Sequence, residues 1–188
     1  RLKPIFVDTG RQSAEEVVAA AARLIHEDGV HAIINGYNIG PQNSEYEVIA
    51  DAGIIYIHHN TLLQHHDTVL SNPDRYFGCF MANPAEYWYG QGFIKFLSWL
   101  RDTDQWVPDS NRIAIISGSK PYSIVIANAM ASAAARFDWT VSFGPKILST
   151  PRDDWRDVIG EAQASKPAVI ANTHFYATDL ASFQKQFV

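Results

Sequence analysis

HAIINGYNIGPQN, residues 31–43, is the stretch that decides the fold of this chain. The apolar run 32–34 leads into a turn that contains Gly36 and Gly40, and Pro41 follows where a helix can begin. A strand, a glycine-containing turn and a helix start in this order are typical of a parallel α/β sheet. Ligands bind such sheets at the carboxyl ends of the strands, so we expect residues 36–40 to lie at a binding site.

Strands and helices alternate on both sides of this stretch. A strand is expected at residues 5–7, and the capping-box pair Ser13 and Glu16 opens an amphipathic helix that Gly29 ends. The other expected strands or extended segments are 54–57, 76–81, 113–116, 140–143 and 168–171. The other expected helices are 41–52, 86–100, 122–137, 153–164 and 179–187, whereas 58–74 is expected to be an irregular polar connection.

This alternation predicts an α/β fold with parallel, doubly wound sheets. The strands are continuously apolar, which favours sheets that are covered on both faces. In the aromatic helix, inward packing is expected for Trp88, Phe93, Phe96, Leu97 and Leu100. The polar piece 101–111, which contains Pro108, is the best candidate for a domain boundary. We therefore expect two lobes, residues 1–105 and 106–188.

Composition excludes several classes of function. The chain has 188 residues, of which 47% are hydrophobic and 19% charged, as in an ordinary folded domain. Fifteen basic and twenty acidic residues give a net charge of −5 without a basic cluster, so no nucleic-acid partner is expected. No apolar run approaches the roughly 18 residues of a membrane span. The one cysteine, Cys79, lies among apolar residues and is expected to be an inert buried thiol.

Signatures of enzymes and of nucleotide binding are missing from the sequence. The glycine turn does not have the G-x-G-x-x-G spacing, and no phosphate-binding loop of the G-x-x-x-x-G-K-[ST] type occurs. Ser117 and Lys120 have the S-x-x-K spacing of a serine acylase, but the companion motifs are missing, so a polar turn at a helix start is favoured. The sequence predicts neither catalytic residues nor a cofactor.

Four histidines lie close together at positions 58, 59, 65 and 66. Imidazoles at such spacing can bind zinc, but no acidic or cysteine ligand stands at an ordered spacing from them. A hydrated loop with one or two histidines that face a cleft is therefore preferred, and no metal site is expected.

Polar and aromatic residues recur just after the expected strands. They are Tyr37 and Asn38, then His59, Asn60 and Thr61, then Ser119 and Tyr122, and last Thr173, His174 and Tyr176. Helix N-termini hold anions and aromatic walls cover apolar groups, so these tips suit a small ligand that carries a carboxylate or an amide. The simpler alternative is that they are ordinary loop residues, which are polar in most proteins.

The order of these motifs resembles the substrate-binding proteins of branched-chain amino acid ABC transporters. These proteins have the type I periplasmic binding fold, which urea and amide binders share. The resemblance covers all 188 residues. The matching segments are Asp8, residues 14–28, GVHAIINGYN at 29–38, ADAGI at 50–54, Tyr89-Gly90, RIAII at 112–116, Pro121-Tyr122, Asp154-Trp155 and PAVI at 167–170.

The resemblance implies a ligand held in a cleft between two lobes, and a membrane permease that recognises the closed form. It implies ligand contacts from one lobe at Tyr37, Asn38, Ile39, Gly40, His59, Asn60 and Thr61. From the other lobe it implies contacts at Tyr122, Thr173, His174 and Tyr176. Position 39 is Ile where the family usually has a small hydroxyl residue, so this turn is expected to bind mainly through backbone N–H groups. The family's chain also begins one strand and one helix earlier and continues past Val188, so both lobes are expected to be incomplete here.

The expected function is that of a non-enzymatic, periplasmic or otherwise extracytoplasmic solute-binding protein. It would capture an amino acid or amide-like ligand and deliver it to ABC permease subunits, without inserting into the membrane itself. The alternative is a ligand-sensing receptor or amide-responsive regulator with the same fold.

Overall fold

The computed structural model describes residues 2–36, 43–59 and 62–188. The chain forms two compact units, Arg1–Ala85 and Glu86–Val188, and each is described by itself. Within the described residues, no helix combines the length and the hydrophobicity needed to cross a membrane.

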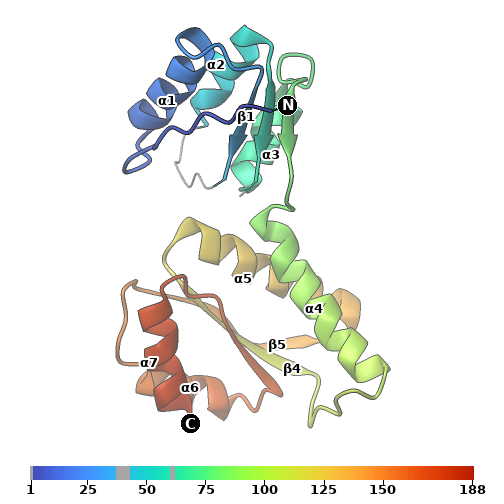
Figure 1. Cartoon of the computed structure of the whole chain (residues 1–188). Coiled ribbons are helices and arrows are strands. Elements are labelled where there is room, and N and C mark those ends of the chain that lie inside the picture. The colour runs from blue at the N-terminus through green and yellow to red at the C-terminus, as the bar shows by residue number, and fades with distance from the viewer. Residues whose placement is uncertain (1, 37–42, 60–61) are drawn as a thin grey trace. The chain divides into compact units, whose positions relative to one another are not determined.

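The first unit contains a parallel three-stranded sheet in the order β1-β2-β3 (Figure 1). Its core gathers Ile33, Tyr46, Ile49, Tyr56 and Cys79 between the sheet and its helices. The elements are α1 (Ala14–His26), β1 (Ala32–Asn35), α2 (Glu45–Ala52), β2 (Ile55–His58), α3 (Leu63–Ser71) and β3 (Cys79–Met81).

The second unit contains a parallel sheet in the order β5-β4-β6. Its elements are α4 (Glu86–Asp102), β4 (Arg112–Gly118), α5 (Pro121–Ala134), the 3-10 helix η1 (Ala135–Phe137), β5 (Thr140–Leu148), α6 (Arg156–Ala164), β6 (Val169–Asn172) and α7 (Ala177–Phe187). Ile113 and Ile115 of the central strand β4 point into a core with α4 and α5. Ala114 and Ile116 point into a second core with α6 and α7. Helices therefore cover both faces of this sheet, as predicted.

The α/β fold with parallel sheets is confirmed, but within residues 2–36, 43–59 and 62–85 helices cover one face of the first unit's sheet and leave the other exposed. Ile34, Ile55 and Phe80 are 72%, 49% and 54% exposed. The prediction was wrong here because the described part of this unit supplies helices to only one of the two apolar faces.

Two predicted elements of the first unit also differ. Residues 5–7 form no strand, because they pair with no neighbouring strand, and Phe6 is 89% exposed. The region 58–74 is not irregular, since it contains α3. Asn43 connects this polar helix to the chain before α2. Its side chain donates to Gln64 O at 3.0 Å and to Thr68 Oγ1 at 2.7 Å, and these long-range contacts cannot be seen in the helix's own sequence.

Helix α4 belongs to the second unit, where it runs along α5 (Figure 1). The expected boundary near residue 105 thus falls inside that unit. The face that α4 buries is formed by Glu86, Gly90, Ile94, Leu97 and Ser98. Of the residues expected to pack inward, Leu97 is buried and Phe93 is partly buried against the core. The expectation was wrong for Trp88 and Phe96, which are 53% and 50% exposed, because a helix that is apolar on several sides does not reveal which side is covered.

Candidate ligand-binding site

A hydrogen-bonded polar group closes the carboxyl end of the first unit's sheet. Asn35, at the end of β1, donates through Nδ2 to the hydroxyl of Tyr56 at 3.1 Å. That hydroxyl donates to Oε1 of Glu45 at 3.3 Å. Glu45 and Tyr56 are 3% and 1% exposed, and burial together with the Glu45 carboxylate raises the pKa of Tyr56. The Tyr56 hydroxyl therefore stays protonated and can donate a hydrogen bond next to the end of β1.

Two histidines are buried next to this group. His58, the last residue of β2, and His65, in the first turn of α3, are both fully buried, and their ring centroids lie 4.1 Å apart. Burial lowers the pKa of His58 to about 4 and that of His65 to about 3, with a smaller contribution from a neighbouring histidine in each case. Both imidazoles are consequently neutral at physiological pH.

A cavity of about 210 Å³ opens beside the polar group. Asn35, Gly36, Glu45 and Tyr56 form its polar side, and apolar side chains of α1 form the opposite wall. A hollow with both kinds of lining suits a small amphipathic ligand. The cavity lies next to the end of β1 and Gly36, where the sequence predicted a ligand-binding site.

In the second unit the strand tips approach each other closely at Gly118. A Cβ atom there would lie 2.7 Å from Thr150 Oγ1 and 3.0 Å from the ring of His174, so only glycine fits. Thr150 Oγ1 accepts the backbone N–H of Ser119 at 3.1 Å. His174 is 4% exposed, and its ring packs edge-on against Trp155 at 4.6 Å. Burial is the main cause that lowers the pKa of His174.

Aromatic rings gather at the same end of this unit. Tyr122, in the first turn of α5, lies 5.8 Å from Phe175 and 6.5 Å from Tyr89 between ring centroids. Tyr176 lies 5.9 Å from Phe175, and the ammonium of Lys120 stands 5.7 Å above the Tyr176 ring. The arrangement combines an apolar wall with one cation, which suits a ligand with an apolar part and a carboxylate.

The structure places the predicted site residues in different surroundings. Tyr37, Asn38, Ile39, Gly40, Asn60 and Thr61 lie outside the described residues. His59 is exposed, and its backbone N–H donates to Asn35 O at 2.9 Å. Thr173 donates through Oγ1 to Ser123 O at 3.0 Å, a contact within the fold. Tyr122 and Tyr176 lie in the aromatic group. Whether any of the eleven binds a ligand stays a prediction.

Four residues of the buried polar cluster in the first unit were not identified from the sequence: Glu45, Tyr56, His58 and His65. His58 and His65 are not hydrated loop residues, because they end a strand and begin a helix and face the core. Glu45 and Tyr56 were not singled out, since both stand inside otherwise ordinary amphipathic elements. Two signals in the sequence could have identified two of these four residues: Glu45 is a polar residue at the first position of a helix, and His58 is a polar residue at the end of an apolar strand.

No family model and no curated protein matches the chain. Solved structures do match. A putative branched-chain amino acid ABC transporter from Silicibacter pomeroyi is 40% identical with a TM-score of 0.93, and the match covers 97% of this chain and 46% of that one. An ABC transporter substrate-binding protein from Desulfitobacterium hafniense in complex with Leu is 16% identical (TM-score 0.68, 97% and 50% covered). A solute-binding protein from R. palustris in complex with benzoate is 11% identical (TM-score 0.60, 96% and 46% covered).

The last two matches are too low in identity to show more than the fold. The first carries the relationship, and the chain spans about half the length of each of these structures. The matching proteins are binding proteins of transporters and not enzymes, in agreement with the expectation from the sequence. On this similarity, nearly the whole chain corresponds to about half of a putative branched-chain amino acid ABC transporter protein, and it has the type I periplasmic binding fold.

Proposed function

We propose that this chain acts in the solute-binding component of an ABC importer and contributes to the capture of a small amino acid or amide-like ligand. The observation that carries the proposal is the 40% identity to an ABC transporter protein over 97% of the chain. The partners would be ABC permease subunits, and the location periplasmic or otherwise extracytoplasmic.

The chemistry of the strand tips supports this ligand class. The aromatic group of the second unit, Tyr89, Tyr122, Phe175 and Tyr176, offers an apolar wall, and Lys120 offers a positive charge. The first unit offers hydrogen-bond donors and acceptors around a cavity of about 210 Å³. Each of these two groups, taken by itself, suits a small ligand that carries a carboxylate or an amide.

Isothermal titration calorimetry tests the proposal with leucine, valine, benzoate, urea and acetamide. We expect at least one of them to bind with a dissociation constant in the micromolar range, about −8 kcal/mol. Leucinamide, which has the shape of leucine without the negative charge, then separates recognition of a carboxylate from recognition of an amide. If none of these compounds binds below about 1 mM, the proposal fails.

A pair of variants links binding to the aromatic group. Tyr122→Ala is expected to weaken binding by tenfold or more, which corresponds to about 1.4 kcal/mol. Phe96→Ala is the matched control, because it removes an aromatic ring that is 50% exposed on α4. Equal affinities of the two variants would exclude Tyr122 from the site.

A further inference from the structure

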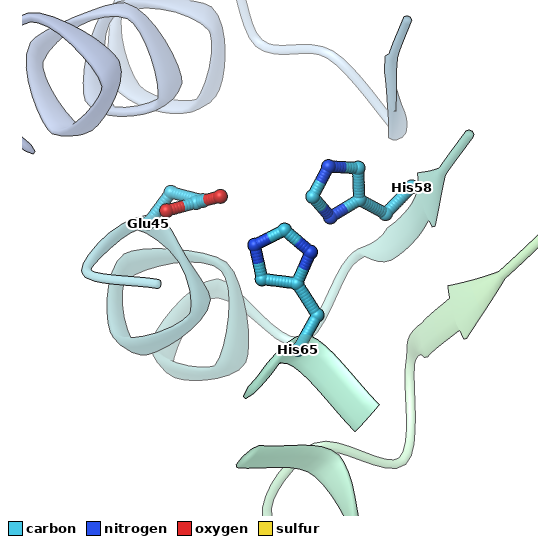
Figure 2. A group of neighbouring side chains, drawn as sticks. All are labelled: Glu45, His58 and His65. Atoms are coloured by element: carbon cyan, nitrogen blue, oxygen red, sulfur yellow. The ribbon is translucent and has the colours of Figure 1, made fainter. Parts of the chain in front are cut away.

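Glu45, His58 and His65 converge from three different elements of the first unit (Figure 2). Glu45 begins α2, His58 ends β2 and His65 lies in α3. One ligand-type atom from each residue, a carboxylate oxygen or an imidazole nitrogen, lies within 4.8 Å of the other two. All three side chains are buried, with exposures of 3%, 0% and 0%.

Within the described residues, each imidazole has one nitrogen with a hydrogen-bond contact and one nitrogen without any. Nδ1 of His58 lies 3.2 Å from the hydroxyl of Tyr46, and Nδ1 of His65 accepts the backbone N–H of Leu62 at 3.2 Å. Nε2 of both rings is buried and has no hydrogen-bond partner among residues 2–36, 43–59 and 62–188. Leaving a buried polar atom unsatisfied is unfavourable, so two such atoms in one cluster need an explanation.

We propose that Glu45, His58 and His65 form a binding site for a divalent first-row transition-metal ion, with Zn²⁺ as the best fit. Two imidazoles and one carboxylate are a ligand set that zinc takes up in proteins, with the fourth position left for water or another ligand. Mg²⁺ and Ca²⁺ prefer oxygen ligands and do not suit this set. The metal proposal does not rest on the proposed solute-binding function, although Glu45 also lines the cavity of the first unit.

The surroundings favour the ligating forms of these side chains. Burial keeps both imidazoles neutral, and a neutral imidazole is the form that binds a metal. The hydroxyl of Tyr56 donates to Oε1 of Glu45 and so orients the carboxylate from outside the site, as partners of metal ligands commonly do.

Metal binding requires a small local adjustment. Bonds of about 2.0–2.1 Å in tetrahedral geometry place ligand atoms roughly 3.3 Å apart, which is shorter than the 4.8 Å limit of the cluster. Rotations of the three side chains can close this difference. His65 must also move its proton from Nε2 to Nδ1 to ligate through Nε2, so the hydrogen bond from Leu62 is lost on binding.

Metal titration of the chelator-treated protein tests the proposal. Calorimetry with Zn²⁺ is expected to show one ion per chain with a dissociation constant of about 10 μM or tighter. Co²⁺ provides an independent measurement on the unaltered protein, because a four-coordinate site is expected to give an intense absorption band in the visible range. A Zn²⁺ affinity weaker than about 1 mM together with a weak, octahedral-type Co²⁺ spectrum would overturn the proposal.

Variants identify the ligands. His58→Gln, His65→Gln and Glu45→Gln are each expected to weaken Zn²⁺ binding at least a hundredfold. His59→Gln and His66→Gln are matched controls, since each changes the histidine next to a proposed ligand, and both are expected to bind like the unaltered protein. An equal loss in the controls would place the metal on the outer histidines and refute the site. If a ligand variant fails to fold, as circular dichroism would show, the Co²⁺ spectrum and the two control variants still decide.

Discussion

Helix α4 approaches α5 so closely at Gly90 that no side chain fits between them. A Cβ atom there would lie 2.7 Å from the Cβ of Ala129, 2.9 Å from the nitrogen of Met130 and closer still to the carbonyl oxygen of Ile126. Non-bonded carbon atoms normally stay 3.5–4.0 Å apart. Since two of the three neighbours are backbone atoms, Gly90→Ala can be accommodated only if the helices separate by on the order of 1 Å.

Gly92 on the same helix is a matched control, because it is exposed and a Cβ there would meet nothing within 4 Å. Replacing either glycine by alanine gains about 1 kcal/mol of helix propensity. Overpacking at position 90 costs roughly 1–3 kcal/mol. The propensity gain cancels when the two variants are compared, so Gly90→Ala should be about 1–3 kcal/mol less stable than Gly92→Ala.

Urea unfolding followed by tryptophan fluorescence measures this difference. All five tryptophans lie in the second unit, so their signal reports the unit to which α4 belongs. With a urea slope of about 2 kcal/mol/M, a difference of 2 kcal/mol moves the midpoint by about 1 M. Coinciding midpoints of the two variants would refute the packing argument.

Three further outcomes are expected. Ser13→Ala should destabilise the first unit by about 1 kcal/mol, measured by urea unfolding followed by circular dichroism, because Ser13 Oγ accepts the backbone N–H of Glu16 at 3.2 Å in a capping box. Burial raises the pKa of Cys79 to about 11, so a thiol reagent at pH 8 should label it only as fast as the first unit opens, and rapid labelling of the folded protein would contradict this. The Arg156 guanidinium lowers the pKa of Asp154 to about 2, so the folded state holds this proton less tightly than the unfolded state and gains stability above pH 4 that is lost between pH 4 and pH 2. Urea unfolding at a series of pH values should show this loss of unfolding free energy, and Asp154→Asn should remove it.

The fold could be predicted from the sequence because the strands are short apolar runs between helix signals. The run at β4 is buried on both faces, and the capping box at Ser13 starts α1 where expected. Helix α3 could not be predicted, since its sequence LQHHDTVLS has few apolar residues. Its contacts include two hydrogen bonds from Asn43, which lies about twenty residues earlier in the chain. Local sequence patterns do not predict hydrogen bonds between residues that are far apart in the chain.

The candidate site was predicted less well than the fold. Tyr122 and Tyr176 do lie at the strand tips, but their partner Phe175 was not singled out. The four neighbouring histidines were treated as one loop, whereas the structure buries His58 and His65 and leaves His59 exposed. The carboxylate that lies near the two buried rings is that of Glu45. It is 13 residues before His58 in the sequence, which is not a spacing that metal-ligand patterns use.

The buried contact between Tyr56, Asn35 and Glu45 has a consequence for how the first sheet assembles. Strands that are apolar on both faces carry no alternating pattern to choose which face turns inward or which residues pair. A slip of β2 by one residue would turn the Tyr56 hydroxyl to the opposite face and break both of its hydrogen bonds. The two hydrogen bonds of Tyr56 are therefore compatible with the register that pairs Asn35 with His58 and not with a register shifted by one residue.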